Sequence, residues 1–387
     1  MAKLSSSNGI EKFPKLRFPE FKEPWNLVKL EDVCSYRKGR AKVKKAQYIS
    51  TENILQNYAG IEPYDDLSEA EGISIQCGDT LMANIRPYLK KVWQSNFNGA
   101  CSTDVLAFSP DNIDGKFLYF LIAQDRFVNY VMCGAKGSKM PRGDKNHILE
   151  YETGVPTESE QRKIAHFIDL LNARISSQNS LINLIKKYKR GSLSALFPKK
   201  GEITPQYRFA GFTKPWEQRK LGDCVEFLDT MRKPLKEGDR EKGQYPYYGA
   251  SGIVDYVSDY IFDEELVLLS EDGANITDRN YPVCFLASGK YWVNNHAHVL
   301  KTNKENENNF ICNSLERMDF TPYNSGMAMP KLNKEVCQKI PLSCPSFAEQ
   351  KEIGDYFRSL DTLITLHQHK YDILLSLKNA LLQQMFI

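Results

Sequence analysis

Hydrophobic positions late in each half of the chain recur with a heptad spacing. Apolar residues follow one another at alternating steps of four and three over 164–185, and the same spacing returns over 353–374. Each seam is interrupted once by a polar residue, Gln178 in the first and His367 in the second. A seam of this length favours a coiled coil. An amphipathic helix packed on its own domain is the alternative.

Both seams are preceded by a helix start signal. Thr157 stands three residues before Glu160, and Ser346 stands three residues before Glu349, which is the spacing of a capping box. We therefore expect a helix to begin at each of these positions and to run about 40 residues, or roughly 60 Å at 1.5 Å per residue.

The two helices are expected to pair antiparallel about a pseudo-two-fold axis, because the rest of the chain is also repeated. In that arrangement the midpoints meet, and the midpoints are Gln178 and His367. A polar pair in one layer of a coiled coil fixes its register at some cost in stability. We predict that these two side chains contact each other.

The repeat is visible in the letters of the sequence. "RFPEFKEPWNLVKLED" from Arg17 corresponds to "RFAGFTKPWEQRKLGD" from Arg208, and "GSKMPRGDKN" from Gly137 corresponds to "GMAMPKLNKE" from Gly326. "PTESEQRKI" and "PSFAEQKEI" then open the two helices. Between these matches each half mixes strand-like runs, turn signals and short helical stretches, which predicts a compact α+β domain in each half.

Composition limits the possible partners and location of the protein. The chain has 387 residues, 42% of them hydrophobic and 26% charged, with a net charge of only +3, so any nucleic-acid partner must be argued from local clusters. The nine cysteines form no CxxC pair, which favours small, buried, reduced thiols. No apolar run spans a bilayer and no signal-peptide core opens the chain, so we expect a cytoplasmic protein without a membrane partner.

Catalytic signatures are weak. The chain lacks a GxxxxGK[ST] loop, a dinucleotide fingerprint, GxSxG, and the Asn/Asp-Pro-Pro-aromatic tetrapeptide of amino-methyltransferases. "PDNIDGK" resembles a nuclease core through Asp111, Asp114 and Lys116, but a surface turn explains it better. His296 and His298 share one face of a strand without an evident third metal ligand. We expect no catalytic residue and no metal.

Basic clusters recur at corresponding places in the two halves. Most such runs form only a solvent-exposed charged surface. Their recurrence in both halves favours contact with phosphates, because cations on loops near Gly and Pro suit a nucleic-acid backbone. The predicted DNA-binding residues are Arg37, Lys38, Arg40, Lys42, Lys44, Lys45, Lys136, Lys139, Arg142 and Lys145 in the first half, and Arg232, Lys233, Lys236, Lys331 and Lys334 in the second.

Taken together, these motifs resemble the specificity subunit of type I restriction-modification systems over nearly the whole chain. The resemblance is carried by the two "PW…KL.D" starts, "GDTLMANIRPYLKKV" from Gly78, "SEDGANI" from Ser270, "VNNHAHVL" from Val293, "MPR", "MPK" and the two helix starts. "VNNHAHVL" recurs in recognition domains of that family, which implies a structural role for its two histidines.

The resemblance implies a domain layout. Residues 1–24 would be an N-terminal extension, 25–156 and 216–345 target recognition domains, 157–199 and 346–387 conserved spacer helices, and 200–215 a linker. The domains would read the halves of a split, asymmetric DNA target, which on one face of the duplex lie about one turn or roughly 34 Å apart.

The same resemblance implies partners. Double-stranded DNA and two modification subunits would bind, and the latter would cover exposed apolar positions on the helices: Leu170, Leu181, Leu184, Leu363 and Leu366. The chain itself would hold no cofactor. Its partners would use S-adenosylmethionine to methylate adenine, and a further restriction subunit, using ATP and Mg²⁺, would cut DNA. A stand-alone DNA-binding regulator and a nuclease are the alternatives.

Overall fold

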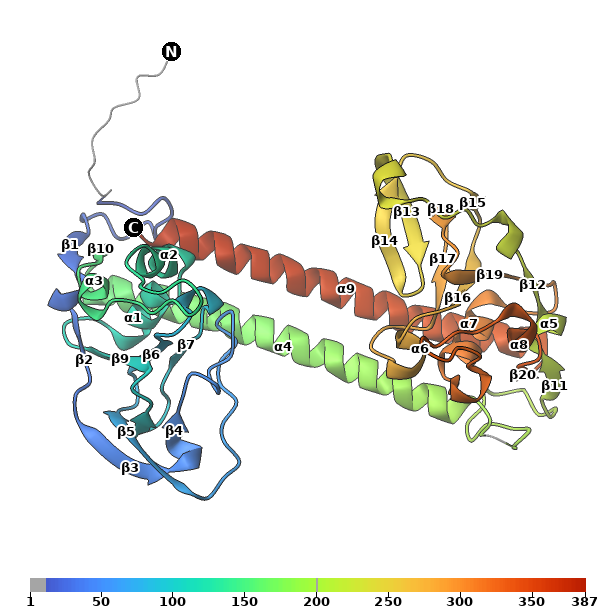
Figure 1. Cartoon of the computed structure of the whole chain (residues 1–387), viewed down its shortest axis with the longest axis horizontal. Coiled ribbons are helices and arrows are strands. Elements are labelled where there is room, and N and C mark those ends of the chain that lie inside the picture. Colours follow the sequence, from blue (N-terminus) through green and yellow to red (C-terminus); the bar gives the residue numbers. More distant parts are fainter. Residues whose placement is uncertain (1–11, 200) are drawn as a thin grey trace, which may run out of the picture. The chain divides into compact units, whose positions relative to one another are not determined.

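In a computed structural model, residues 12–199 and 201–387 are described, and the chain divides into two compact units (Figure 1). Unit 1 comprises Met1–Gln178 and Lys370–Ile387, and unit 2 comprises Asn179–His369. Each unit therefore contains part of both long helices. Of the predicted N-terminal extension, residues 1–11 lie outside the described residues.

Unit 1 contains short strands and helices that lead into the first long helix. The strands are β1 (Asn26–Lys29), β2 (Cys34–Tyr36), β3 (Arg40–Lys44), β4 (Tyr48–Ile49), β5 (Glu69–Ile75), β6 (Thr80–Ala83), β7 (Val92–Gln94), β8 (Gly99–Cys101), β9 (Val105–Pro110) and β10 (Glu152–Val155). The helices are α1 (Gly115–Ile122), α2 (Asp125–Cys133), α3 (Lys145–Leu149) and the start of α4 (Glu158–Leu196).

Unit 2 has a similar content. Its strands are β11 (Glu217–Lys220), β12 (Val225–Phe227), β13 (Lys242–Gly249), β14 (Gly252–Val257), β15 (Phe262–Asp263), β16 (Leu266–Ser270), β17 (Cys284–Ala287), β18 (Lys290–Val293), β19 (Ala297–Thr302) and β20 (Pro341–Cys344). Its helices are α5 (Leu221–Cys224), α6 (Asn275–Asp278), α7 (Asn308–Glu316), α8 (Lys334–Cys337) and the start of α9 (Phe347–Met385).

The sheets show where the two units agree and where they differ. The strand order β2-β9-β6-β7 in unit 1 corresponds to β12-β19-β16-β17 in unit 2, and β1-β10 corresponds to β11-β20. The remaining sheets are connected differently, as β3-β5-β8-β4 and β14-β13-β18-β15. The repeat is therefore confirmed at the level of strand order, and the divergence is concentrated in one sheet of each unit.

An arginine, a tryptophan and a glutamate join the first strand of unit 1 to its long helix. Arg17 donates from Nε and Nη2 to the two carboxylate oxygens of Glu160, both at 2.7 Å, and the Trp25 indole Nε1 donates to Oε1 at 3.3 Å. Glu160 is buried, so these donors replace the water that its carboxylate loses. We call this set the Arg–Trp–Glu clamp of unit 1.

Unit 2 has the same clamp. Arg208 donates to Glu349 at 2.8 and 2.6 Å, and Trp216 Nε1 donates to Glu349 Oε1 at 3.3 Å. The capping-box interpretation of Glu160 and Glu349 is wrong, because both carboxylates are engaged by arginine in a charge-assisted pair rather than by the first turn of their own helix. The clamp explains why the motifs from Arg17 and Arg208 recur.

The glutamine after each clamp glutamate holds a second element. Gln161 accepts from the backbone N–H of Asp114 at 2.8 Å, just before α1, and donates to the Pro156 carbonyl at 2.8 Å. Gln350 accepts from the N–H of Glu307, just before α7, at 3.1 Å. Each Glu-Gln pair therefore joins a long helix to both the start and the middle of its unit.

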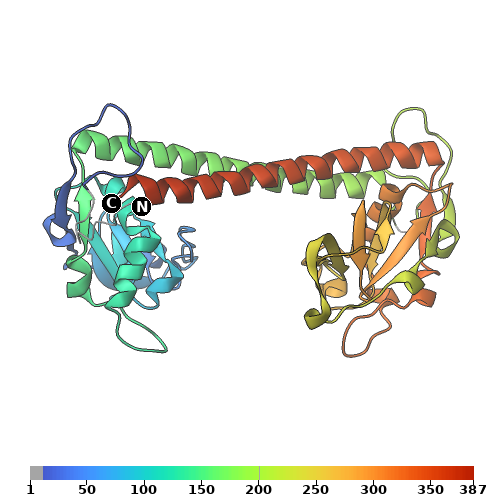
Figure 2. The same cartoon turned by 90° about the horizontal axis from the view of Figure 1, so that it is seen from above.

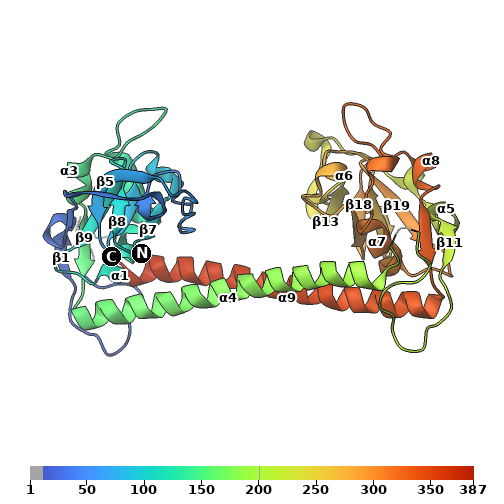
Figure 3. The same cartoon turned by 90° about the horizontal axis from the view of Figure 1, so that it is seen from below.

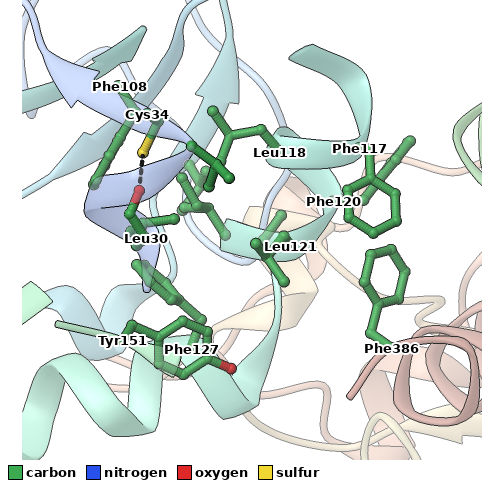
Figure 4. Close-up of a cluster of buried hydrophobic side chains, with 14 of the residues drawn as sticks. Leu30, Cys34, Phe108, Phe117, Leu118, Phe120, Leu121, Phe127, Tyr151 and Phe386 are labelled. Carbon is green, nitrogen blue, oxygen red and sulfur yellow. Dashed lines mark hydrogen bonds between the residues drawn. The ribbon is translucent and has the colours of Figure 1, made fainter. Parts of the chain in front are cut away.

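Aromatic rings at the ends of the long helices complete the two cores. Phe386, at the end of α9, stacks on Phe117 of α1 with centroids 5.0 Å apart in unit 1 (Figure 4). In unit 2, Phe197, at the end of α4, stacks on Phe310 of α7 at 5.3 Å. Each unit thus starts one long helix and packs the end of the other into its core.

Within each unit the helix segments lie side by side and run antiparallel (Figures 1 and 2). In unit 2, Lys189 Nζ lies 2.6 Å from Asp361 Oδ1, and Ser192 Oγ lies 2.8 Å from Tyr356 Oη, so numbers rise along α4 as they fall along α9. In unit 1, Ile164 and Ile168 share a core with Met385. The predicted contact of Gln178 with His367 joins the two units and stays a prediction.

Other expectations from composition have mixed outcomes. All nine cysteines are free thiols, but Cys77 and Cys133 are exposed, so the expectation that every cysteine is buried is wrong. Among the helices of the described residues, none is both long and apolar enough to cross a membrane.

Candidate nucleic-acid interface

The densest basic run forms an edge strand whose charges are largely paired. In β3 the cations Arg40, Lys42 and Lys44 alternate with small or branched residues, and β3 pairs antiparallel with β5. Arg40 Nε lies 3.1 Å from Glu71 of β5, and Lys42 forms an ion pair with Glu69. The β5 carboxylates therefore neutralise much of the face that the sequence predicts to be cationic.

The remaining lysines of this run are of two kinds, one paired with an acid and two unpaired. Lys45 Nζ lies 2.8 Å from Asp66, and that hydrogen bond raises the pKa of Lys45. Lys38 and Lys44 are exposed and have no ion pair within the described part of unit 1. These two are the cations of the run that remain open to a phosphate.

Arg37 is held in an ion pair with Asp79, and its role as a DNA contact stays a prediction. Its Nε and Nη2 both donate to the buried carboxylate of Asp79 at 2.9 Å, and Nη2 also donates to Gln76 at 3.0 Å. The hydrogen bond with Asp79 raises the pKa of Arg37. A guanidinium held in a bidentate pair leaves few donors for a phosphate.

The second basic cluster lies in the loop between α2 and α3, which projects from unit 1 as a teal-green loop in Figure 3. Lys136, Arg142 and Lys145 line one hollow of about 320 Å³. Lys136 Nζ lies 2.7 Å from Asp144, and Arg142 Nη2 lies 2.9 Å from Asp104. The structure thus brings these three predicted residues together.

Two cations of this cluster are open. Lys139 is exposed at the tip and has no ion pair among the described residues, while Lys145 Nζ lies 5.9 Å from the centroid of the Tyr36 ring. Each of the two basic clusters of unit 1 therefore keeps two cations open to an anionic backbone.

Arg86 belongs to this surface and was not predicted. It is exposed, and its backbone N–H donates to the carbonyl of Pro141 at 2.8 Å. It adopts the left-handed conformation with φ of 54°, which is uncommon for a residue with a side chain. A single cation in "NIRPY" gives no local charge signal, so only its position in the fold reveals it.

In unit 2 the predicted cations separate into buried and exposed groups. Arg232 is 12% exposed, and its Nη1 donates to Glu271 at 2.7 Å and to the Ala297 carbonyl at 2.8 Å, so it has a structural role, while its role as a DNA contact stays a prediction. Lys233 and Lys236 are exposed. They follow Arg232 in a segment held by the Trp292 indole, which donates to the Lys233 carbonyl at 2.6 Å.

The last two predicted cations lie in the loop before α8 and at its start. Lys331 Nζ lies 3.3 Å from Glu271, and Lys334 Nζ lies 5.6 Å from the centroid of the Phe227 ring. Both are partly exposed, so unit 2 presents fewer open cations here than unit 1 does around its corresponding loop.

The two histidines of "VNNHAHVL" are bound by acids of the protein. His298 is buried, its Nδ1 lies 2.7 Å from Asp229 Oδ2, and its Nε2 lies 2.7 Å from the Leu332 carbonyl. His296 Nδ1 lies 2.8 Å from Asp272. Burial opposes a charge on His298, but the bonds to Asp229, the Cys337 thiol and the Leu332 carbonyl, with the charge of Asp229, together outweigh burial and raise the pKa of His298 to about 10.

His298 therefore belongs to a buried charge network. Asp229 and Glu271 supply the acids, and Arg232 and Lys331 supply further cations. The network ties β12, β16 and β19 to the loop before α8. Within the described residues no group of three potential ligands is placed to hold a metal ion.

The nuclease alternative is not supported by the geometry of its residues. Asp114 is the N-cap of α1 and accepts from the N–H groups of Lys116 and Phe117. Lys116 Nζ lies 2.6 Å from Asp169 of α4. These side chains are therefore occupied in capping and in an ion pair, as a helix start requires.

The predicted partner-binding leucines are exposed on the long helices. Leu170 and Leu184 on α4, and Leu366 on α9, are each exposed, as are Leu181 and Leu363. Apolar side chains at these positions lie outside the buried seam, so they are available for contact with another protein chain.

Comparisons with known proteins identify the family. A family model described as "Type I restriction modification DNA specificity domain" matches residues 22–187 and again 213–375. The chain therefore belongs to this family and carries two copies of its domain.

Relatives and solved structures agree. A protein of Haemophilus influenzae assigned as a type I restriction enzyme specificity subunit is 37% identical over 150 residues, which is 39% of this chain and 38% of that protein. A relative assigned as a type I specificity subunit in Mycoplasma pneumoniae is 24% identical over 77% of this chain and 80% of its own length. The crystal structure of the type I restriction-modification S subunit from M. genitalium has a TM-score of 0.66 and 16% identity, covering 97% of this chain and 99% of that one, and it shows the same fold.

Proposed function

We propose that this chain is the DNA specificity subunit of a type I restriction-modification complex, in which each unit reads one half of a split, asymmetric target. The observation that carries the proposal is the presence of two family domains in one chain, matched in clamp and strand order but different in one sheet. Recognition of two dissimilar half-sites requires two domains that share a scaffold and differ in the surface that contacts the bases.

In this proposal the open cations contact phosphates. They are Lys38, Lys44, Arg86, Lys139 and Lys145 in unit 1, and Lys233, Lys236 and Lys334 in unit 2. Phosphate contacts position a protein on the duplex and make binding depend on salt, while base reading requires additional side chains.

The open cations can be tested by the salt dependence of DNA binding. Arg86→Ala and Lys139→Ala are each expected to reduce the slope of log binding constant against log salt by about 0.9, the effect of one phosphate contact. Lys42→Ala, which removes a cation already paired with Glu69, serves as the control and should leave the slope unchanged. Fluorescence anisotropy over a range of salt concentrations measures this. Equal slopes for all four proteins would contradict the assignment.

The long helices are proposed to set the spacing between the half-sites and to dock two modification subunits. The exposed leucines support this, because a stand-alone regulator has no need of apolar side chains outside its helix seam. The proposed domain limits remain 25–156 and 216–345, with the spacer helices following each. In this complex the partners bind S-adenosylmethionine, ATP and Mg²⁺, and this chain supplies the choice of sequence rather than the chemistry.

Docking can be tested by placing a charge on the leucine surface. Leu184→Glu is expected to abolish co-purification with the modification subunit, because an unpaired carboxylate would be buried in the contact. Asn183→Glu, at the neighbouring exposed position of α4, is the matched control and should co-purify normally. Circular dichroism confirms that both variants keep their helices. Normal co-purification of Leu184→Glu would place the partner elsewhere.

The proposed function is tested by expressing the chain with its modification subunit and sequencing host DNA for N6-methyladenine. We expect a bipartite methylated motif that disappears when the chain is deleted. An active modification subunit that methylates the same sites with and without the chain would contradict the proposal. No new motif together with tight, specific DNA binding by the chain alone would support the stand-alone regulator.

A further inference from the structure

Each unit presents an exposed methionine at the tip of the same projecting loop. In unit 1 the loop 136–142 carries Met140, which is 52% exposed, and in unit 2 the loop 325–331 carries Met329, which is 61% exposed. Met327 in the second loop is fully exposed, at 103%. Both Met140 and Met329 directly precede a proline. Large apolar side chains at loop tips are costly to solvate, and their recurrence in both units indicates a shared use.

The bases of both loops are closed by hydrogen bonds. Lys136 and Arg142 exchange backbone hydrogen bonds, both at 2.9 Å. In unit 2, the Ser325 N–H donates to the Lys331 carbonyl at 2.8 Å, and the Asn324 side chain accepts from the Lys331 N–H at 2.9 Å. The methionines are therefore held out by a defined loop.

Glycine permits the tight path of the second loop. A Cβ at Gly326 would collide with the carbonyl oxygen of Met329, so no larger residue fits there without moving the tip. In the first loop Gly137 has φ of 95°, a conformation that favours glycine.

In each unit a residue with a positive φ donates a backbone hydrogen bond to the loop. Arg86, which follows β6, donates its N–H to the Pro141 carbonyl at 2.8 Å, and Gly273, which follows β16, donates to Pro330 at 3.0 Å. Their φ angles are 54° and 113°. The left-handed conformation is unfavourable for an arginine, and Arg86 adopts it where its N–H fixes the loop. β6 and β16 occupy the same place in the shared strand order.

The charge around the first loop indicates what its tip meets. The cations near Met140 are Lys136, Lys139, Arg142, Lys145 and Arg86, and the acids that pair with them are Asp104 and Asp144. A single apolar side chain amid excess cations does not resemble the apolar core of a protein interface. It matches proteins that hold phosphates with cations while an apolar wedge such as Met enters between base pairs.

We propose that Met140 and Met329 are wedges that insert against a base-pair step, each in the half-site bound by its own unit. This inference rests on the proposed function, since it names the part of that DNA contact which deforms the duplex. Met327 extends the wedge of unit 2. The flanking cations anchor the backbone on either side of the step.

The wedge is tested with the chain reconstituted with its modification subunits. The probes are DNA duplexes with the target sequence that the methylation map identifies. Each duplex carries 2-aminopurine at one of a series of successive positions, and the fluorescence of 2-aminopurine rises when the base unstacks. We expect the wild type to raise the fluorescence at one step in each half-site. Met140→Ala should abolish the rise in the half-site of unit 1 only and weaken binding about tenfold, as expected when the burial of one apolar side chain is lost. Met329→Ala should act in the other half-site.

Two controls separate the wedge from other causes. Met140→Leu keeps an apolar side chain of similar size and should retain the rise, while Ile203→Ala, at an exposed apolar residue outside both loops, should behave as wild type. The inference would be overturned if Met140→Ala kept wild-type fluorescence and affinity. It would also be overturned if the effect of Met140→Ala were a failure to assemble with the modification subunits. Failure of the proposed function is distinct, because the wild-type complex would then show no methylated motif at all.

Discussion

Replacing Glu349 with alanine is expected to lower the free energy of unfolding of unit 2 by about 3 kcal/mol, because breaking a buried ion pair leaves its partner uncompensated. Arg208 is 15% exposed and would lose both of its bonds to the carboxylate, and the Trp216 indole would lose its acceptor. Urea unfolding, with hydrogen exchange to locate the weakened segments, measures the loss.

Unit 1 provides an internal comparison for this prediction. Glu160→Ala removes the corresponding clamp, so it should weaken the segments of unit 1 by a similar amount and spare those of unit 2 away from the long helices. Glu352→Ala, at an exposed position three residues beyond Glu349, is the control and should change stability little. If the Glu349 and Glu352 variants unfolded at the same urea concentration as the wild type, the clamp would not be a stabilising element.

The stability of unit 2 is expected to fall between pH 6.5 and pH 10. His298 has an ordinary pKa of 6.5, and its pKa in the folded unit is raised to about 10 by its bonds to Asp229, the Cys337 thiol and the Leu332 carbonyl, against the effect of burial. The folded state therefore holds a proton that the unfolded chain releases above pH 6.5. The resulting stability is fully present below pH 6.5 and is lost as the pH rises through 10. The loss is on the order of 5 kcal/mol.

Two neighbouring histidines allow a matched test of this pH dependence. His298→Gln removes the titrating group from the network with Asp229, Glu271 and Arg232, so its stability should be lower at neutral pH and nearly level across this range. His296→Gln, at an exposed histidine two residues away, should keep the wild-type profile. Urea midpoints measured at intervals of pH decide between them. A profile of His298→Gln parallel to the wild type would show that another group titrates.

The repeat, the long helices and the α+β class could be predicted from the sequence because they depend on local signals. A heptad seam needs only its own residues, and α4 and α9 each run 39 residues, close to the expected length. The two copies of "PW…KL.D" marked the clamp without revealing its chemistry. The partner of Arg17 is Glu160, more than a hundred residues away, and spacing alone suggested a capping box.

The sequence locates the basic clusters but does not show which of their cations are paired, because a run of cations does not reveal which acids the fold brings to it. Glu69 and Glu71 reach β3 through strand pairing, and Asp79 reaches Arg37 from a loop before β6. Conversely, Arg86 stands alone in the sequence and becomes part of a cationic surface only through its bond to Pro141. Charge patterns along a chain therefore indicate a region but not the residues that remain open.

The most direct test of the central claim is to exchange residues 25–156 for the corresponding segment of a relative with another target, and to map N6-methyladenine by single-molecule sequencing. The account predicts a methylated motif in which one half is new and the other half is unchanged. A motif altered in both halves, or altered in neither by an exchanged chain that still assembles, would contradict the claim that each unit reads its own half-site.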